Sequence, residues 1–140
     1  MLQGAFLVLH CRTSKRILAV VETDDKPEWS KEKGQLSFPG GTLEPNEEVL
    51  SGLMREILEE TGLVLTGECS PIYRQHYLIV GNTGVHARIH VFYADVPEEL
   101  PVSTRNAYWV SIDNILSPDS KKIRPFITRE VFEIAFNSSR

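Results

Sequence analysis

The sequence has too few cysteines for a disulfide framework. Cys11 and Cys69 are its only cysteines, and their separation forms no CxxC pair. Small secreted proteins held together by disulfides carry many more, so we expect two reduced thiols and a cytoplasmic protein. Residues 1–8 lack the basic segment and the cleavage site of a signal peptide, which favours the same location.

Long apolar runs and an excess of positive charge are missing as well. No stretch approaches the ~20 apolar residues that a membrane-spanning helix needs. The formal net charge is −4, which argues against a broad non-specific surface for nucleic acid. Hydrophobic residues make up 41% and charged residues 24% of the chain, as in ordinary globular proteins. A length of 140 residues predicts one domain, residues 1–140.

What the sequence does have is a group of acidic residues with helical spacing. Glu56, Glu59 and Glu60 stand at i, i+3 and i+4, so all three would project from one face of a helix. Like charges this close repel one another, and a divalent cation would relieve the repulsion. Ligands that are all oxygen favour Mg²⁺ or Mn²⁺ over zinc. Taken alone, however, the three glutamates are more simply interpreted as a solvated acidic face.

The residues around these glutamates favour a helix that follows a tight turn. Two adjacent glycines, Gly40 and Gly41, predict the turn. Asn46 is a candidate N-cap, which would place Glu47 in the first helical turn, where the helix dipole favours negative charge. Gly62 provides a C-terminal stop. We therefore expect a helix over residues 46–61.

Residues 41–63 match a known catalytic motif in full. The motif is a glycine, five residues, a glutamate, seven residues, Arg-Glu, an aliphatic residue, any residue, Glu-Glu, any residue, a glycine and an aliphatic residue. Because every fixed position is filled, the stretch resembles the Nudix box of the Nudix hydrolase superfamily. The fixed positions hold Gly41, Glu47, Arg55, Glu56, Ile57, Glu59, Glu60, Gly62 and Leu63.

The resemblance implies a reaction and the residues that carry it. Enzymes of this superfamily hydrolyse a nucleoside diphosphate linked to another moiety, with Mg²⁺ or Mn²⁺ as cofactor. By position, Glu56, Glu59 and Glu60 look like metal ligands, and the carbonyl oxygen of Gly40 resembles the family's backbone ligand. Either Glu56 or Glu59 would lie near the attacking water, and Arg55 looks like the residue that orients the glutamates. The supporting residues would be Gly41, Glu47 and Gly62.

Outside the box, the hydrophobic patterns predict strands on both sides of the helix. The strands are expected at residues 2–11, 16–22, 34–39, 73–80, 85–96 and 107–110, the first two forming a hairpin. Residues 85–96 alternate as a half-buried strand does. A helical turn capped by Ser111 and a C-terminal helix that ends at Phe136 follow. This order predicts an α/β/α sandwich around a mixed sheet, which is also the fold that the resemblance implies.

Several residues outside the box are further candidates. Trp29 stands in a charged loop over residues 24–33 and is expected to anchor that loop, with stacking on a nucleobase as the alternative. Glu98 or Glu99 could add an acid near the metal, but solvated loop acids are the favoured interpretation. Core packing is favoured over stacking on a base for Phe38, Tyr73, Tyr77 and Phe92. For Arg74 and Arg88, a cross-strand ion pair is at least as well supported as phosphate binding. A polar-face or hydrogen-bonded role is favoured over metal ligation for His76, His86 and His90. A solvated face is favoured over RNA contact for Lys121, Lys122 and Arg124.

The compact length resembles that of MutT-like nucleoside triphosphate pyrophosphohydrolases, and this is the predicted activity. One alternative is removal of pyrophosphate from the 5′ end of RNA. Residues 35–41 are also similar to the entry of coenzyme A pyrophosphatases, so coenzyme A or a dinucleotide is another candidate substrate. A module that senses nucleotides without hydrolysing them would not need the complete set of glutamates. We expect a small nucleotide as substrate and no membrane partner, and homodimerisation stays open.

Overall fold

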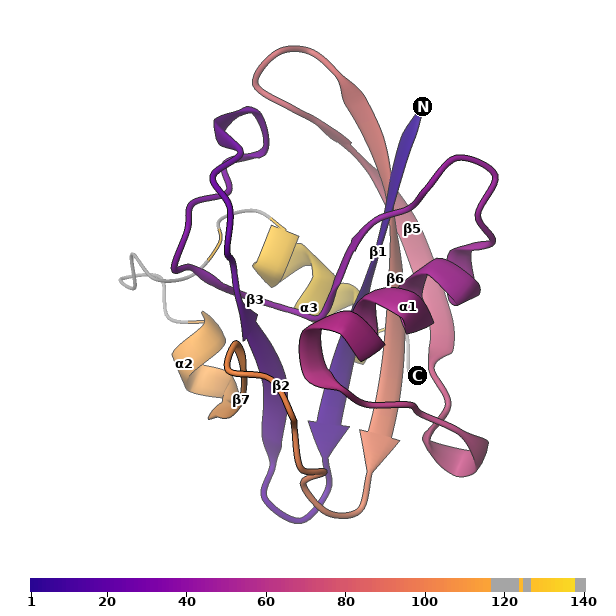
Figure 1. Ribbon diagram of the computed structural model, residues 1–140, viewed down its shortest axis with the longest axis vertical. Helices are drawn as coiled ribbons and strands as arrows, with labels where there is room; N and C mark the ends of the chain where they lie inside the picture. Colours follow the sequence, from indigo (N-terminus) through magenta and orange to yellow (C-terminus); the bar gives the residue numbers. More distant parts are fainter. Residues whose placement is uncertain (117–123, 125–126, 138–140) are drawn as a thin grey trace.

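One mixed sheet organises the computed structural model, which describes residues 1–116, 124 and 127–137 (Figure 1). Its strands are β1 (Leu2–Cys11), β2 (Arg16–Val21), β3 (Leu36–Ser37), β4 (Gly40–Thr42), β5 (Ile72–Val80), β6 (His86–Val96) and β7 (Ala107–Ser111). The order is β3-β2-β1-β6-β5, with β4 added to β1 and β7 added to β2. The long strands β1 and β6 pair in parallel, and the other pairs are antiparallel. The predicted mixed sheet is therefore confirmed.

Helices cover both faces of this sheet. Besides two 3₁₀ turns, η1 (Pro27–Trp29) and η2 (Gly67–Cys69), the helices are α1 (Val49–Thr61), α2 (Ile112–Leu116) and α3 (Ile127–Asn137). Leu53 and Ile57 of α1 are fully buried in the core cluster on one face, and Val131 and Ala135 of α3 are fully buried in the cluster on the other. Figure 1 shows α1 and α3 on opposite sides of β1 and β6. The expected α/β/α sandwich is confirmed.

Strand β1 shows how one segment supplies both cores. Alternation along the strand sends Leu7 and Leu9 into the cluster beneath α1, and Phe6 and Val8 into the cluster beneath α3. All four side chains are buried, at 5% exposure or less. A near-continuous apolar run is what a central strand covered on both faces requires.

Strand β6 is buried more completely than its alternating sequence predicts. On the face expected to be polar, His90 is only 8% exposed and Phe92 only 4%. Phe92 packs into the cluster beneath α1, which covers this face of the sheet. The prediction of a half-buried strand is therefore wrong for the second half of β6.

The box helix begins at Val49 and not at Asn46. Asn46 has a φ of 63°, in the left-handed region, so it belongs to the turn before the helix. Glu48 occupies the N-cap position and makes no capping hydrogen bond with its side chain. The predicted cap at Asn46 and the predicted place of Glu47 in the first helical turn are wrong. The predicted stop is confirmed, because Gly62 has a φ of 78° at the C-cap.

The two glycines before the helix lie in a strand and not in the predicted turn. Gly40 and Gly41 begin β4, which pairs antiparallel with β1. Gly40 has a φ of 145°, and a Cβ there would overlap the backbone of Ala5. A Cβ on Gly41 would lie 3.0 Å from Cδ of Glu56. The absence of side chains thus lets β4 approach both β1 and the acidic face of α1.

The C-terminal part follows the predicted order in the stretches that the structure describes. The hydroxyl of Ser111 accepts a hydrogen bond from the backbone N–H of Asn114 at 3.3 Å, as a cap does. Lys121 and Lys122 lie outside the described residues, whereas Arg124 lies within them. In residues 1–116 and 127–137, no helix has the length and apolar character needed to cross a membrane.

Candidate active site

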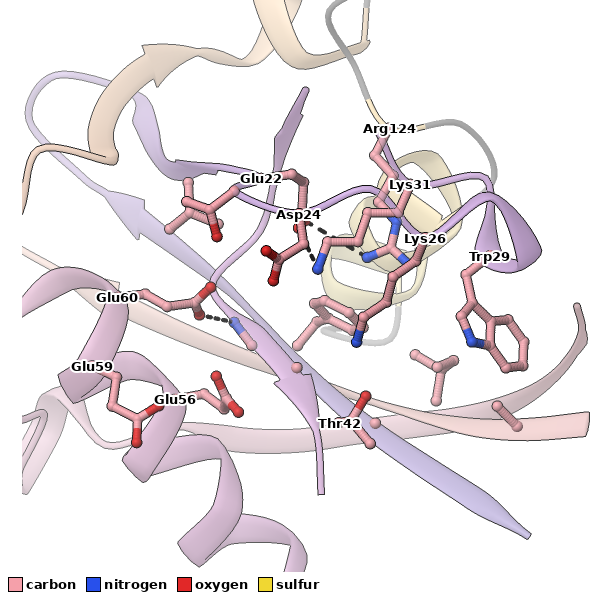
Figure 2. A pocket seen from close by; sticks show the side chains of 18 of the residues that line it. Glu22, Asp24, Lys26, Trp29, Lys31, Thr42, Glu56, Glu59, Glu60 and Arg124 are labelled. Carbon is pink, nitrogen blue, oxygen red and sulfur yellow. Dashed lines mark hydrogen bonds and ion pairs between the residues drawn. The ribbon is translucent and has the colours of Figure 1, made fainter. Parts of the chain in front are cut away.

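The acidic face of α1 borders a cavity of about 430 Å³. Glu56, Glu59 and Glu60 line it together with Gly40 and Gly41 of β4. Figure 2 shows the three glutamates on one side of the cavity, with Glu60 turned toward the backbone of β4. The structure therefore brings together the three acids and the two glycines that the sequence singled out.

Arg55 joins several of the box acids into one network. Its Nε and Nη2 atoms donate to the two carboxylate oxygens of Glu47, at 2.9 and 3.0 Å. Its Nη1 atom donates to Glu56 at 3.1 Å and lies 3.5 Å from a carboxylate oxygen of Glu59. These hydrogen bonds from Arg55 lower the pKa of Glu47 to about 2, and the carboxylates in turn raise the pKa of Arg55.

Glu47 ties the loop before α1 to the helix. Its carboxylate accepts a hydrogen bond from the backbone N–H of Glu44 at 2.8 Å, in addition to those from Arg55. A Cβ on Gly52, inside the helix, would lie 2.8 Å from the same carboxylate. Glycine is costly within a helix, by up to ~1 kcal/mol relative to alanine. Here the missing side chain leaves room for Glu47.

Glu60 is the acid held most deeply. Its Oε1 atom accepts a hydrogen bond from the backbone N–H of Gly40 at 2.7 Å, and its backbone carbonyl accepts one from the hydroxyl of Thr104. Among the described residues, no lysine or arginine forms an ion pair with Glu60. Burial raises the pKa of Glu60 to about 8, and it also raises the pKa of Glu56.

The donors on this wall fit a hard divalent cation. Glu56, Glu59 and Glu60 offer carboxylate oxygens, the ligands that Mg²⁺ and Mn²⁺ prefer. A cation among them would stabilise the charged form of Glu60, which burial disfavours. The ligand set is not closed, however: within the described part of the chain, no three acidic, histidine or cysteine side chains already converge as a metal site. Arg55 instead neutralises Glu56 and Glu59 in this arrangement.

Charged residues from outside the box form the opposite wall. The carboxylate of Glu22 lies 3.0 Å from Nζ of Lys31 and 3.7 Å from Nη1 of Arg124. The side chain of Arg124 is 9% exposed, so its expected place on a solvated face is wrong. Sequence reasoning missed Glu22 and Lys31, since no local pattern marks residues that meet only in the fold. Lys26 and Asp24 line the cavity beside them (Figure 2).

Trp29 stands at the border of the cavity and holds its loop in place. A Cβ on Gly81 would lie 2.9 Å from the Trp29 ring, which shows how closely the loop packs on the turn between β5 and β6. Asn82 donates from its backbone N–H to the carbonyl of Glu28 at 2.7 Å, and from its side chain to that of Pro27 at 2.6 Å. The expected anchoring role is confirmed, and the alternative of base stacking stays a prediction.

The loop acids near residue 98 do not reach this cavity. Glu99 forms an ion pair with Arg16 at 2.6 Å, and Glu98 accepts a hydrogen bond from Thr13 at 3.2 Å. Both partners belong to the hairpin end of β1 and β2. The favoured interpretation of ordinary loop acids therefore agrees with their positions.

Four of the other strand candidates make contacts away from this cavity. The hydroxyl of Tyr73 lies 3.0 Å from Nδ1 of His90 and 3.2 Å from Nδ1 of His76. The guanidinium of Arg74 stacks over the Tyr93 ring at 5.0 Å. None of these five side chains lines the cavity. They thus follow the packing interpretation that the sequence favoured.

Solved structures share this fold at low sequence identity. A NUDIX hydrolase from Nitrosomonas europaea is 22% identical, with a TM-score of 0.69 over 94% of this chain and 86% of that chain. A MutT protein from Methanosarcina mazei Go1 is 21% identical, with a TM-score of 0.68 over 94% and 90%. The dihydroneopterin triphosphate pyrophosphohydrolase of E. coli is 18% identical, with a TM-score of 0.70 over 94% and 92%. At these identities the likeness shows the fold alone.

The sequence itself identifies the family. No curated protein sequence matches this chain. A family model described as NUDIX domain matches residues 1–129. This range includes the acidic helix and all the residues that line the cavity, from Leu2 to Arg124. The chain therefore belongs to the NUDIX family and is a Nudix hydrolase.

Proposed function

We propose that this hydrolase cleaves a nucleoside triphosphate and releases pyrophosphate. One observation carries the proposal: a single cavity has the three box glutamates on one wall and Lys26, Lys31 and Arg124 on another. Its volume of about 430 Å³ suits one small ligand. A triphosphate chain is a polyanion, and its charge would be offset by a cation among the acids and by the ammonium groups of Lys26 and Lys31.

Members of the family generally use divalent metal ions. We assign the ion here, Mg²⁺ or Mn²⁺, to Glu56, Glu59 and Glu60 with the backbone carbonyl of Gly40. When bound, such an ion offsets phosphate charge and lowers the pKa of a bound water. The oxygen-only donor set and the burial of Glu60 support this assignment.

The chain's own residues would then orient the reactants and accept a proton. Glu56 or Glu59 is the proposed general base that takes the proton from the attacking water. Arg55 is a positioning residue, since its guanidinium contacts both of these carboxylates. Glu47 in turn holds Arg55 through two hydrogen bonds. The glycines that permit this arrangement are Gly41, beside Glu56, and Gly62, at the end of α1.

We also propose that the protein works in a reducing compartment of the cell. Both cysteines are free, Cys11 buried and Cys69 partly exposed, which supports a reducing compartment such as the cytoplasm. We predict that residues 1–140 form a single domain. Homodimerisation also stays a prediction, and size-exclusion chromatography with light scattering would test it.

A substrate panel with product analysis tests the activity. The panel contains nucleoside triphosphates, oxidised triphosphates, ADP-ribose, coenzyme A, dinucleoside polyphosphates and RNA with a 5′-triphosphate. The proposal expects pyrophosphate and a nucleoside monophosphate from triphosphates, and no turnover in excess EDTA. Turnover confined to RNA, coenzyme A or a dinucleotide would replace the proposed substrate. A nucleotide-dependent rise in melting temperature without any product would indicate a sensor.

Variants of the glutamates test the assigned residues. We expect Glu56→Gln and Glu59→Gln each to lower kcat by about two to four orders of magnitude, because each loses a proton acceptor and a charged ligand. Glu98→Gln, on a loop outside the cavity, is the matched control and should keep the wild-type kcat. Circular dichroism and thermal melting would confirm that each variant is folded. Wild-type kcat in both cavity variants with Mg²⁺ would disprove the assignment.

A further inference from the structure

We propose that Arg124 determines base specificity, by donating hydrogen bonds to an oxo group on the edge of the nucleobase. Bases that present an oxo group there would bind better than bases that present an amino group. The inference rests on the proposed function, because it takes a nucleoside triphosphate as the ligand. It concerns a residue outside the Nudix box, on the segment that leads into α3.

Arg124 is a buried cation whose donors are only partly used. Its side chain is 9% exposed and lines the cavity. The Nε atom is buried and has no hydrogen-bond partner among the described residues. Its Nη1 atom is 3.7 Å from Glu22, too long for a hydrogen bond. Buried donors without acceptors cost free energy, so a ligand in the cavity that offers acceptors would be stabilised here.

The surroundings of Arg124 suit a flat apolar group. Its guanidinium lies over the Phe6 ring, 5.9 Å from the ring centre. Trp29 and Ile79 line the same cavity and pack against the core cluster that contains Phe6. Figure 2 shows Arg124 and Trp29 across the cavity from Glu56 and Glu59. With the phosphates at the acidic wall, the base is the part of a nucleotide that reaches Arg124.

The neighbouring charges favour a neutral acceptor over a phosphate at this place. Glu22 lies beside both Arg124 and Lys31, so it offsets part of their positive charge. A phosphate next to Arg124 would be repelled by the Glu22 carboxylate. An oxo group accepts hydrogen bonds from the guanidinium and adds no negative charge. An amino group would instead place donors against donors.

If the Arg124 side chain had only a structural role, its substitution would have a different effect on ligand binding. The backbone N–H of Arg124 donates to the carbonyl of Leu36 at 2.9 Å, and this bond survives any change of side chain. The ion pair with Glu22 could hold the segment before α3 in place, and its loss would lower stability for all ligands alike. Only a base contact changes the ratio between two ligands that differ at the base edge.

Binding of two matched nucleotides tests the inference without any turnover. Inosine and adenosine triphosphates differ at position 6 of the base, where one carries an oxo group and the other an amino group. We would measure the Kd of their α,β-imido analogues by calorimetry with Mg²⁺, for the wild type, Arg124→Lys, Arg124→Gln and Arg129→Lys. Arg129 is the control, an exposed arginine of α3 paired with Glu133. Thermal melting would report the stability of each variant.

The wild type and Arg129→Lys should prefer the inosine analogue on the order of tenfold, and both Arg124 variants should lose this preference. Equal affinity of the wild type for the two analogues, or binding of neither, would overturn the inference. So would a preference that persists in folded Arg124→Gln, or an equal loss of affinity for both analogues. Pyrophosphate release from ordinary triphosphates is measured separately. Release without a base preference rejects Arg124 alone, whereas preference without release rejects the proposed function.

Discussion

Arg55 shows, at the scale of single residues, that the box encodes positions as well as charges. Its guanidinium donates to Glu47 with two nitrogens and to Glu56 with the third. A planar fork of donors is specific to arginine, and a lysine could not satisfy both partners in this geometry. The distance of 3.5 Å to Glu59 extends the same network by one helical turn. Glu47, Glu56 and Glu59 are therefore coupled through one cation before any metal binds.

The Glu47 carboxyl predicts a loss of stability in acid. Hydrogen bonds from Arg55 hold its pKa at about 2, below the ordinary value of 4.5. A carboxyl whose pKa is lowered by folding stabilises the protein above the unfolded pKa, and this contribution disappears as the pH falls toward the folded pKa. We expect the free energy of unfolding to decrease between pH 4.5 and pH 2, and to decrease less in Glu47→Gln.

Urea unfolding at several pH values measures this difference. Glu48→Gln is the matched control, because Glu48 is exposed at the neighbouring position. It should keep the wild-type dependence on pH. An identical dependence in Glu47→Gln and the wild type would show that the Arg55 network does not hold the Glu47 carboxyl in its charged form.

At the scale of elements, the start of α1 shows tertiary contacts overriding a local signal. Asn46 has the side chain of a good N-cap, yet an N-cap residue needs an extended backbone, and Asn46 has a φ of 63°. The backbone N–H of Glu47 donates to the carbonyl of Glu44 at 3.1 Å, which closes a turn there. That turn allows the Glu47 carboxylate to reach Arg55. A pattern of capping residues cannot register such a contact, because it joins a loop to the middle of the helix.

The backbone of Asn46 gives a prediction at the same scale. Left-handed φ costs ~1–2 kcal/mol for most L-residues, is tolerated by asparagine and costs glycine nothing. We expect Asn46→Ala to lower the free energy of unfolding by about 1 kcal/mol, and Asn46→Gly to leave it within a few tenths of the wild type. Urea unfolding of the two variants measures the difference. Equal stability of the alanine and glycine variants would contradict the assigned backbone conformation.

At the scale of the whole molecule, the sandwich could be predicted and one wall of the cavity could not. Periodicity is local, so the strands, the acidic helix and the spacing of Glu56, Glu59 and Glu60 could be read along the chain. Strand β4 was missed because glycines carry no strand signal; its pairing depends on the close approach to β1. Lys31 and Arg124 come from a charged loop and from the segment before α3, and they meet only through the Glu22 carboxylate. The sequence thus predicted the acidic wall of the cavity but not the basic residues of the opposite wall.

Two loops, residues 24–33 and residues 81–84, pack together at one border of the cavity. Trp29 packs on Gly81, and Asn82 donates two hydrogen bonds to the carbonyls of Pro27 and Glu28. Because these contacts are shared, we expect Trp29→Ala to raise amide hydrogen exchange in residues 24–33 and 81–84 alike, and to leave the amides of α1 protected. Tyr108→Ala removes a half-exposed aromatic ring from β7 and is the control. Exchange would be measured by mass spectrometry. If it rose in residues 24–33 alone, the turn between β5 and β6 would be independent of Trp29, and the two loops would open separately.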